Sequence, residues 1–553
     1  MRFRHQDQNL EISVVTGTHT GLLSFDMPKA KTRDLLGFAI ERLEHKTNRR
    51  YWLEGLKCFK SLVAQPRRGD SYASNIHPLQ TFFWMDYTLK PNEQYTYQII
   101  PMYGPSPLQL SFGPSTQITI ETEPFSSKND KHEVYFNRGV SGSQYYSNRF
   151  GTSKLDKLSE KDQQLALQWL QSGLFDGFLH FINTAKSGEK LLGAFYEFKH
   201  PNAVAALKNA AEKGVEVKIT CDGTAGYKDE NMHTVQQLQA EALLNIKYRK
   251  VSGLKIPHNK FLVHCDRNGK PVKIWTGSTN ISEKAFFGHC NTGHVIKDKS
   301  VAAQYLAFWE KLYSNAEMKD LKAFNLQVEP DLAPGNALSK EMYTFFSPRK
   351  NSNLLKYYAG LMNQAKQVVC AVFPFNVDES LRTVFEEDKD YLRFVIIDKR
   401  SRYNKINRID PDLKVTYGGV VNLPVYQWSK EVSAGGVFYS GVNFVHNKFI
   451  LIDPLSDNPI VISGSANFSK PSLTGNDENT LIIQGNKRIA DIYLTEHTRL
   501  YSHFYFRDFL KNNPRSATIF DPFLKEDDSW IKDYYEPNDF SFKRKKLLKE
   551  MSL

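Results

Sequence analysis

The sequence predicts an α/β protein made of two similar halves that follow an amino-terminal β-sandwich. Three observations support this prediction: residues 10–125 alternate polar and bulky side chains in short runs, later residues alternate helix-like and strand-like segments, and the order of those segments occurs twice. A chain of 553 residues is too long for one hydrophobic core, so about three domains are expected. We place them at residues 1–125, 126–330 and 331–553.

The amino-terminal segment is predicted to be a sandwich because runs such as QTFFWMDYTL and YTYQIIPMY are separated by Pro, Gly and Asn. Within it, Leu89, Pro91 and Tyr95 resemble the tyrosine corner of fibronectin type III and related β-sandwich domains, where a tyrosine ties down the entry of a strand. An ordinary hairpin with aromatic strands is the alternative.

Helix and strand signals alternate from about residue 150. Ser159 can cap a helix through LALQWLQ, AVAALKNAAEKG is an alanine-rich helix ended by Gly214, and the strand VEVKITCD follows. A similar order returns in TFFSP, LLKYYAGLMNQA, VVCAVFPF and YLRFVIID. We therefore predict an internal duplication, with two α/β/α units whose mixed sheets are flanked by helices.

The composition is that of a folded protein with an anionic partner. Hydrophobic residues make up 41% and charged residues 24%, and the net charge is +12. The first residues contain no apolar run of signal-peptide length, and no later run has the length of a membrane helix. Five scattered cysteines do not make a disulfide framework. We expect a soluble protein in the cytoplasm.

Two passages share one pattern of polar residues: HNKFLVHCDRNGKPVKIWTGSTNIS, from His258, and HNKFILIDPLSDNPIVISGSANFS, from His446. His and Lys two positions apart on a strand project from the same face, and a neighbouring strand would bring Ser and Asn to the same end. Each passage thus supplies donors for one phosphate. Together, the two lysines and two asparagines would compensate the charge of the phosphate without a metal ion. The residues are His258, Lys260, Ser278 and Asn280, and then His446, Lys448, Ser465 and Asn467.

These passages resemble the paired HKD motifs of the phospholipase D superfamily, over roughly residues 150–515. The resemblance implies that the two halves of one chain form a single site, so that a monomer suffices, without cofactor or metal. It also implies a covalent phosphohistidine on one histidine and general acid/base catalysis by the other. By the family's usual assignment, His258 is the nucleophile and His446 the acid/base.

The first motif departs from the family pattern at its acidic position. Asp453 matches it in the second motif, whereas Cys265 occupies the corresponding place in the first and Asp266 comes one residue later. A one-residue insertion before Asp266 would make it equivalent to Asp453. Because a residue seven positions after the histidine lies on the opposite face of a strand, we expect both carboxylates to support the site from outside it.

Two further residues occupy equivalent places after the motifs. Asn291 lies in HCNTGHVI and Glu478 in NDENTLII. In the superfamily, a Glu or Asn so placed often orients a catalytic histidine, which makes Glu478 a supporting residue, although a surface acid at the start of a strand is the alternative.

A group of histidines and cysteines near the first motif does not predict a zinc site, because its spacing fits no common zinc motif. The residues are His264, Cys265, His289, Cys290 and His294.

The run FKRKKLLK near the carboxyl terminus is a strong local concentration of positive charge. Such runs are more often a solvated tail or helix face than a nucleic-acid or lipid contact, and we expect the former.

The main functional hypothesis is a phosphodiesterase that hydrolyses nucleic acid, as an endonuclease, or phospholipid. Positive charge and the lack of a membrane segment favour nucleic acid. Peripheral contact with anionic surfaces is a further expectation. The alternatives are a phosphatidyl-transfer enzyme and a non-catalytic scaffold that binds nucleic acid or lipid, which intact His, Lys and Asn in both repeats disfavour.

Overall fold

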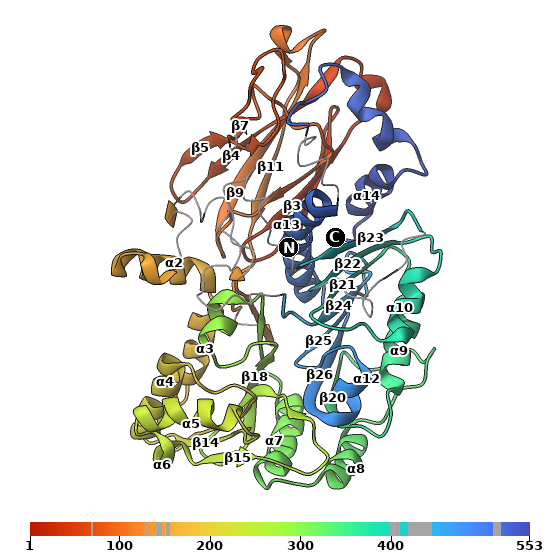
Figure 1. Cartoon of the computed structure of the whole chain (residues 1–553). Helices are drawn as coiled ribbons and strands as arrows, with labels where there is room; N and C mark the ends of the chain where they lie inside the picture. Colours follow the sequence, from red (N-terminus) through yellow and green to blue (C-terminus); the bar gives the residue numbers. More distant parts are fainter. Residues whose placement is uncertain are drawn as a thin grey trace.

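The computed structural model describes residues 1–67, 70–127, 130–139, 146, 149–150, 155–398, 406, 410–418, 445–512 and 521–553, with the side chains of 506–512 left out. Figure 1 shows three parts: a β-sandwich at the top and two α/β halves side by side beneath it. In the described ranges, no helix combines the length and apolar character needed to cross a membrane.

The amino-terminal part is a sandwich of two antiparallel sheets, as predicted, and its core lies between them. The first sheet contains β1 (Arg2–Gln6), β2 (Glu11–Thr16), β3 (Gly21–Asp26) and β8 (Phe83–Asp86). The second contains β10 (Ser111–Phe112), β9 (Gln94–Tyr103), β4 (Leu35–Glu44) and β5 (Arg49–Trp52), with β11 (Thr116–Glu121) paired to β9. The short strands β6 (Glu54–Gly55) and β7 (Tyr72–Ala73) form a separate ribbon, and 3₁₀ turns lie at η1 (Lys29–Lys31) and η2 (Pro107–Gln109).

The tyrosine corner is present in this sandwich. The Tyr95 hydroxyl accepts a hydrogen bond from the Lys90 N–H at 2.9 Å and donates one to Glu93 Oε2 at 3.2 Å. Because Tyr95 is fully buried, these bonds satisfy a hydroxyl that would otherwise be costly to desolvate, and they fix the loop that leads into β9.

The first α/β half is built on a seven-stranded mixed sheet. Ser159 caps its first long helix by accepting from the Asp162 N–H, and Gly214 (φ +88°) follows the helix that the alanine-rich run forms. The strand order is β12 (His132–Phe136), β19 (Thr292–Ile296), β18 (Pro271–Gly277), β17 (Lys260–Cys265), β13 (Lys190–Phe195), β14 (Glu216–Asp222) and β15 (Ile246–Arg249). The helical segments are η4 (Leu155–Lys157), α2 (Glu160–Gln171), α3 (Leu174–Asn183), α4 (Pro201–Glu212), α5 (Tyr227–Gln237), α6 (Glu241–Leu244), the π-helical turn η5 (Lys284–Gly288), α7 (Lys299–Tyr313) and α8 (Met318–Val328).

The second half repeats this topology strand for strand, which confirms the predicted duplication. The strand order is β20 (Met342–Ser347), β26 (Asn476–Gln484), β25 (Ile460–Gly464), β24 (Phe449–Ile452), β21 (Val368–Phe373), β22 (Leu392–Ile397) and β23 (Leu413–Tyr417). Its helices are α9 (Asn353–Asn363), α10 (Glu379–Glu386), α12 (Lys470–Gly475) and α13 (Lys487–Asn512). A short strand of the first half, β16 (Ile256–Pro257), pairs in parallel with β26 and so joins the second sheet.

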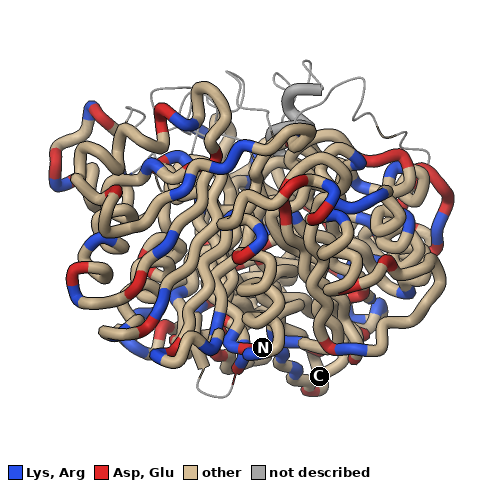
Figure 2. Tube along the Cα trace, turned by 90° about the horizontal axis from the view of Figure 1, so that it is seen from below, with Lys and Arg blue, Asp and Glu red and all other residues tan. Residues whose placement is uncertain are grey.

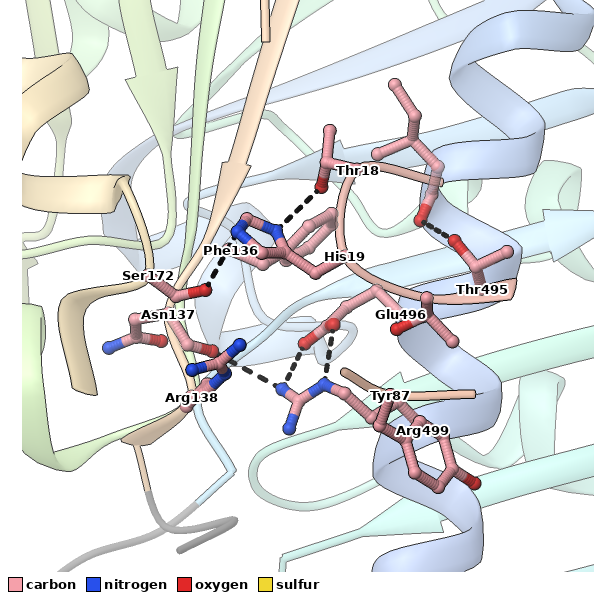
Figure 3. A pocket seen from close by; sticks show the side chains of 12 residues that line it. Thr18, His19, Tyr87, Phe136, Asn137, Arg138, Ser172, Thr495, Glu496 and Arg499 are labelled. Atoms are coloured by element: carbon pink, nitrogen blue, oxygen red, sulfur yellow. Dashed lines mark hydrogen bonds and ion pairs between the residues drawn. The ribbon is translucent and has the colours of Figure 1, made fainter. Parts of the chain in front are cut away.

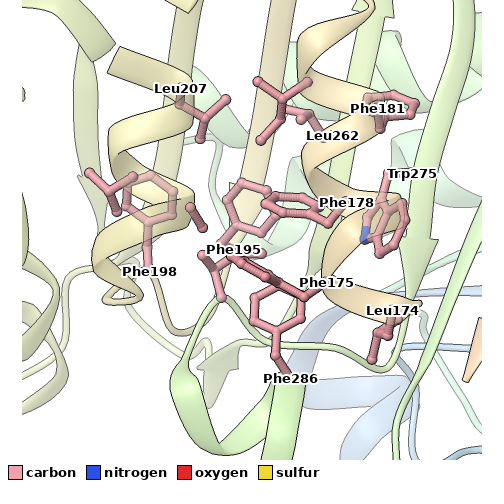
Figure 4. Packing of buried hydrophobic residues seen from close by; sticks show 14 of the residues in the cluster. Leu174, Phe175, Phe178, Phe181, Phe195, Phe198, Leu207, Leu262, Trp275 and Phe286 are labelled. Atoms are coloured by element: carbon pink, nitrogen blue, oxygen red, sulfur yellow. The ribbon is translucent and has the colours of Figure 1, made fainter. Parts of the chain in front are cut away.

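An aromatic core holds α3 against the first sheet (Figure 4). The ring of Phe178 lies 5.2 Å from that of Trp275 on β18, in an edge-to-face arrangement, and Phe195 stacks on Phe198 at 5.5 Å. Burying such side chains stabilises the fold by about 1.5–3 kcal/mol each. The packing fixes β18, at whose end the first Gly-Ser-x-Asn sequence begins.

The carboxyl-terminal residues lie against the sandwich, after η6 (Asp528–Tyr535), as α14 (Phe540–Lys549). Trp530 Nε1 donates to the Leu35 carbonyl at 2.8 Å, and Lys545 Nζ lies 2.9 Å from Asp26 Oδ1. The basic run therefore forms a helix whose buried Lys545 is paired within the chain. The segment also packs against the second half, where Leu548 lies in the same buried cluster as Val368 and Leu455, so its grouping with that half stays a prediction.

Candidate active site

The two motif histidines lie where the chain passes from one sheet to the other. His258 stands between β16 and β17, and its N–H donates to the Asp477 carbonyl of the second half at 2.9 Å. His446 follows Val445, which bridges to Cys290, and its N–H donates to the Cys290 carbonyl of the first half at 2.9 Å. The expectation that each His-x-Lys lies within a strand was thus wrong for both histidines, whose backbones bond to the opposite half, and for Lys448, which precedes β24 (Phe449–Ile452); Lys260 begins β17.

The side chains of both histidines also have partners in the opposite half. His258 Nδ1 lies 2.9 Å from Glu478 Oε1, and His446 Nδ1 lies 2.9 Å from Asn291 Oδ1. Glu478 is on β26, and Asn291 immediately precedes β19, the equivalent strand. Since Nδ1 of each ring is engaged, Nε2 is the nitrogen left for chemistry.

The motif lysines are buried beside the histidines. Lys260 Nζ donates to the His258 carbonyl at 2.6 Å, and Lys448 Nζ donates to the His446 carbonyl at 2.8 Å. Lys260 Nζ also lies 5.3 Å from the centre of the Tyr196 ring. Each lysine therefore braces the backbone of its own histidine while it brings positive charge close to the site.

His258, Asn280, His446 and Asn467 line one cavity of about 710 Å³. Within the described residues, Oδ1 of Asn280 and Oδ1 of Asn467 have no hydrogen-bond partner. The Asn467 N–H donates to Glu478 Oε2 at 3.1 Å, which joins this asparagine to the carboxylate that holds His258. The cavity thus unites the histidine and asparagine of both motifs, with the lysines just behind its wall.

Burial and neighbouring cations shift the pKa values of the site. Burial and the adjacent Lys260 lower the pKa of His258 to about 4, against the opposing effect of Glu478. Burial also lowers the pKa of Lys260 to about 7, and the pKa values of Lys448 and His446 well below their usual ranges. A buried site that brings cationic groups close together favours the binding of an anion.

The motif serines and glycines shape the strands and do not line the cavity. Ser278 Oγ donates to Asn291 Oδ1 at 2.8 Å, and Ser465 Oγ accepts from the Asn479 N–H at 3.0 Å. A Cβ at Gly277 would lie 2.2 Å from the Thr292 carbonyl oxygen, and one at Gly464 2.3 Å from that of Asn479. Glycine is required in both motifs because the next strand approaches so closely.

The two acidic residues differ in what they bind. Asp453 accepts hydrogen bonds from the N–H groups of residues 366–368, at 2.7 to 3.0 Å, and so anchors the start of β21. Asp266 instead accepts from Asn268 and Lys270 within its own hairpin, at 2.9 Å. Cys265 pairs with Lys190 at the place where Asp453 bonds to Val368. The contacts of Asp266 are therefore unlike those of Asp453, in contrast to the expected equivalence.

Three cavity residues were not among the sequence candidates for the phosphate site. The ring centres of His289 and Phe375 lie 6.2 and 6.3 Å from the ring centre of His446. The ring centre of Tyr196 lies 5.2 Å from that of His258. The available signal for His289 was its place two residues before Asn291. No spacing rule marks Tyr196 or Phe375, which stand just after β13 and β21.

The histidines and cysteines considered for zinc do not converge. His294 Nε2 lies 3.0 Å from His132 Nδ1, and His264 Nε2 lies 2.8 Å from Glu189 Oε2. Among the residues that the structure describes, no group of three or more His, Cys, Asp or Glu side chains is placed to hold a metal ion.

Duplicated mixed sheets with histidines held across their interface agree with the arrangement that the resemblance to the phospholipase D superfamily implies. The family described as cardiolipin synthase, PLD-like domain, matches residues 178–313 and 392–500, one segment in each half. The two matched segments are thus similar to phospholipase D-like domains, one in each half, and they follow an amino-terminal β-sandwich. No curated protein sequence matches the chain.

Solved structures resemble parts of the chain at low identity. Phosphatidylserine synthase from Haemophilus influenzae Rd KW20 is 12% identical, with a TM-score of 0.42. The match covers 69% of this chain and 94% of the synthase. Polyphosphate kinase from Porphyromonas gingivalis is 10% identical, with a TM-score of 0.37. The match covers 57% of this chain and 46% of the kinase. Yeast tyrosyl-DNA phosphodiesterase is 11% identical, with a TM-score of 0.31. The match covers 55% of this chain and 84% of the phosphodiesterase.

Proposed function

We propose that this protein is a phosphodiesterase that cleaves its substrate through a phosphohistidine on His258, with His446 as general acid and base. The observation that carries the proposal is that these two histidines line one cavity while each is held by the opposite half. Such mutual support orients both rings before the substrate arrives, which is how enzymes reduce the entropy cost of reaction.

The unequal partners of the histidines support this division of roles. Glu478 is a carboxylate, and it offsets the positive charge that develops on His258 as Nε2 forms a bond to phosphorus. Asn291 is neutral, so His446 can gain and lose a proton without a fixed charge opposing either step. Two supporting residues of different charge thus suit one nucleophile and one proton carrier.

The reaction begins with neutral His258, whose lowered pKa keeps it unprotonated near pH 7. Its attack on phosphorus breaks the bond to the leaving oxygen, which takes a proton from His446. The anionic diester supplies the charge that raises the pKa of His446 enough to hold that proton before attack. His446 then removes a proton from water, and the resulting hydroxide cleaves the phosphohistidine bond. Lys260, Lys448, Asn280 and Asn467 compensate the phosphate charge.

Nucleic acid is the first substrate that we propose, because the net charge is +12. In the view of Figure 2, however, Lys and Arg are interspersed with Asp and Glu. The cavity wall likewise contains Lys255 and Lys470 together with Glu197 and Glu379. A phospholipid, cleaved or transferred to an alcohol, is the second candidate, which the description of the matching family favours.

The test uses bis-p-nitrophenyl phosphate in the presence of EDTA, with wild-type protein and the variants H258N and H446N. Wild-type protein should release nitrophenol, and both variants should lose at least about 100-fold in rate. The phosphorylated adduct should accumulate in H446N and be absent in H258N. His264, which pairs with Glu189 outside the cavity, supplies the control, since H264N should retain activity.

The same proteins should then be incubated with labelled DNA, RNA and phosphatidylcholine, with and without a primary alcohol. Cleavage of DNA or RNA supports the nuclease proposal, and an alcohol-dependent lipid product supports transfer. If the wild-type protein is inert on all these substrates and on the nitrophenyl ester, the binding scaffold is favoured instead.

A further inference from the structure

We propose that Asn137 is a positioning residue for His446, acting through Asn291, and that it relays to the active site how the first half is packed against α13. This inference rests on the proposed function. Asn137 follows β12, far in sequence from either motif, and is only 1% exposed.

All the hydrogen-bonding groups of the Asn137 side chain serve one loop. Its Nδ2 donates to the carbonyl of Ala285 at 3.1 Å, to that of Phe286 at 2.9 Å and to that of His289 at 2.7 Å. Its Oδ1 accepts from the Asn291 N–H at 2.8 Å. One buried amide thus holds both ends of residues 285–291.

That loop carries the groups that contact His446. Asn291 Oδ1 bonds to His446 Nδ1, the Cys290 carbonyl accepts the His446 N–H, and His289 lies beside the His446 ring on the cavity wall. A shift of the loop would therefore move the ring and its backbone together. Misplacement of a reacting group by about 1 Å can cost about 100-fold in rate.

The segment that carries Asn137 is itself fixed from two sides. The Arg138 N–H donates to the Leu170 carbonyl of α2 at 2.8 Å, and Arg499 of α13 donates to the Asn137 carbonyl at 3.4 Å. A small polar cavity beside this segment is lined by Arg138, Glu496, Arg499 and His19 of the sandwich, and in Figure 3 the side-chain amide of Asn137 points away from Glu496 and Arg499. At Gly139 (φ +45°), a Cβ would lie 2.4 Å from the His289 carbonyl oxygen, so the segment lies tightly against the loop.

The second repeat holds Glu478, its equivalent of Asn291, by different contacts. Ser347, at the position equivalent to Asn137, pairs with Glu478 in the β20–β26 register. Glu478 is held instead by Ser472 Oγ, by Asn476 Nδ2 at 2.8 Å and by the Asn467 N–H. Among the residues that the structure describes, a single side chain spans the supporting loop in the first repeat alone, which makes Asn137 a point at which His446 can be disturbed without His258.

The experiment compares N137A with N325A, using bis-p-nitrophenyl phosphate and the phosphorylated adduct as readouts. Asn325 is equally buried and donates to the Pro348 carbonyl at 3.0 Å, but it lies outside the cavity. N137A should lower kcat about 10- to 100-fold, leave KM within about two-fold, accumulate the adduct as H446N does, and change the pH profile. N325A should lower thermal stability without any of these effects.

A double-mutant cycle tests whether the effect passes through Asn291. N137A/N291A should be no slower than N291A alone, because the lost contact is shared. If N137A does not fold, N137S is used in the same cycle, since it retains a small polar group. Equal kcat and pH profile in N137A and N325A, or additive losses in the cycle, would overturn the inference while leaving the proposed function intact; an inactive wild-type protein would instead overturn the proposed function.

Discussion

Glu478 Oε1 lies 2.9 Å from His258 Nδ1, although the two residues are 220 positions apart and belong to different halves of the chain. The contact requires both sheets to be folded and packed together. The ring of His258, the proposed nucleophile, is therefore held in place only when the other half is present.

Replacement of Glu478 by Gln should lower kcat about 10- to 100-fold, because the charge that supports His258 is removed. The carboxylate opposes the lowering of the His258 pKa, so its loss should depress that pKa further and move the acidic limb of the pH–rate profile to lower pH. Steady-state kinetics between pH 4 and 8 would measure both effects. E189Q, at the His264 pair outside the cavity, is the control, and an equal loss in both variants would contradict the prediction.

Arg249 should stabilise the packing of the two halves. Its Nε lies 2.6 Å from Asp477 Oδ2 in a fully buried pair, and burial raises the pKa of Asp477 to about 6. R249M should lower the free energy of unfolding by about 3–5 kcal/mol at pH 8, since it leaves a buried charge unpaired. At pH 5 the loss should be smaller, because Asp477 is then protonated. Urea titrations at both pH values test this, and equal losses would refute it.

Stability should fall in mild acid. Burial lowers the pKa of His200 to about 4 from a usual value near 6.5, so the unfolded chain binds the proton more readily between these values. The contribution of neutral His200 to the free energy of unfolding is complete above about pH 6.5 and is lost as the pH falls towards 4. His200 accepts the Ala203 N–H as the cap of α4. H200N keeps a good cap and should reduce this loss by about 3 kcal/mol.

Thermal unfolding of wild-type protein and H200N across that pH range provides the measurement. The variant's side chain lacks the imidazole contacts with Phe175 and Phe286, so its melting temperature should be lower at pH 8. The decisive quantity is the slope against pH, and identical slopes would show that His200 does not titrate on unfolding.

The lysines of α14 should differ in their effect on stability. Lys545 is buried, pairs with Asp26, and lies 3.9 Å from the centre of the Tyr535 ring. K545M should destabilise the protein by about 2–4 kcal/mol, because it removes the buried ion pair and the cation–π contact and leaves Asp26 paired with the more exposed Lys549. Lys546 is half-exposed and, within the described part of the chain, pairs with Glu550 on the same helix, so K546M should cost less than about 0.5 kcal/mol. Equal effects in chemical denaturation would indicate that α14 is not docked.

The sequence by itself determined the duplication, the sandwich and the chemical groups of the site. His258 and His446, with their Lys and Asn companions, could be found because the same spacing occurs twice, and Tyr95 because its corner is local. Patterns of this kind depend on strand periodicity and on short turns, which are properties of neighbouring residues.

Only the tertiary structure decided which partners each histidine has. The assignment of Glu478 to His258 and of Asn291 to His446, the bracing by Asn137, and the docking of α14 on the sandwich all join residues far apart in the chain. The physical reason is that these contacts arise from the way two sheets pack against each other. Spacing along one strand sets the face on which a side chain lies, but it carries no information about which residue of another sheet will meet it.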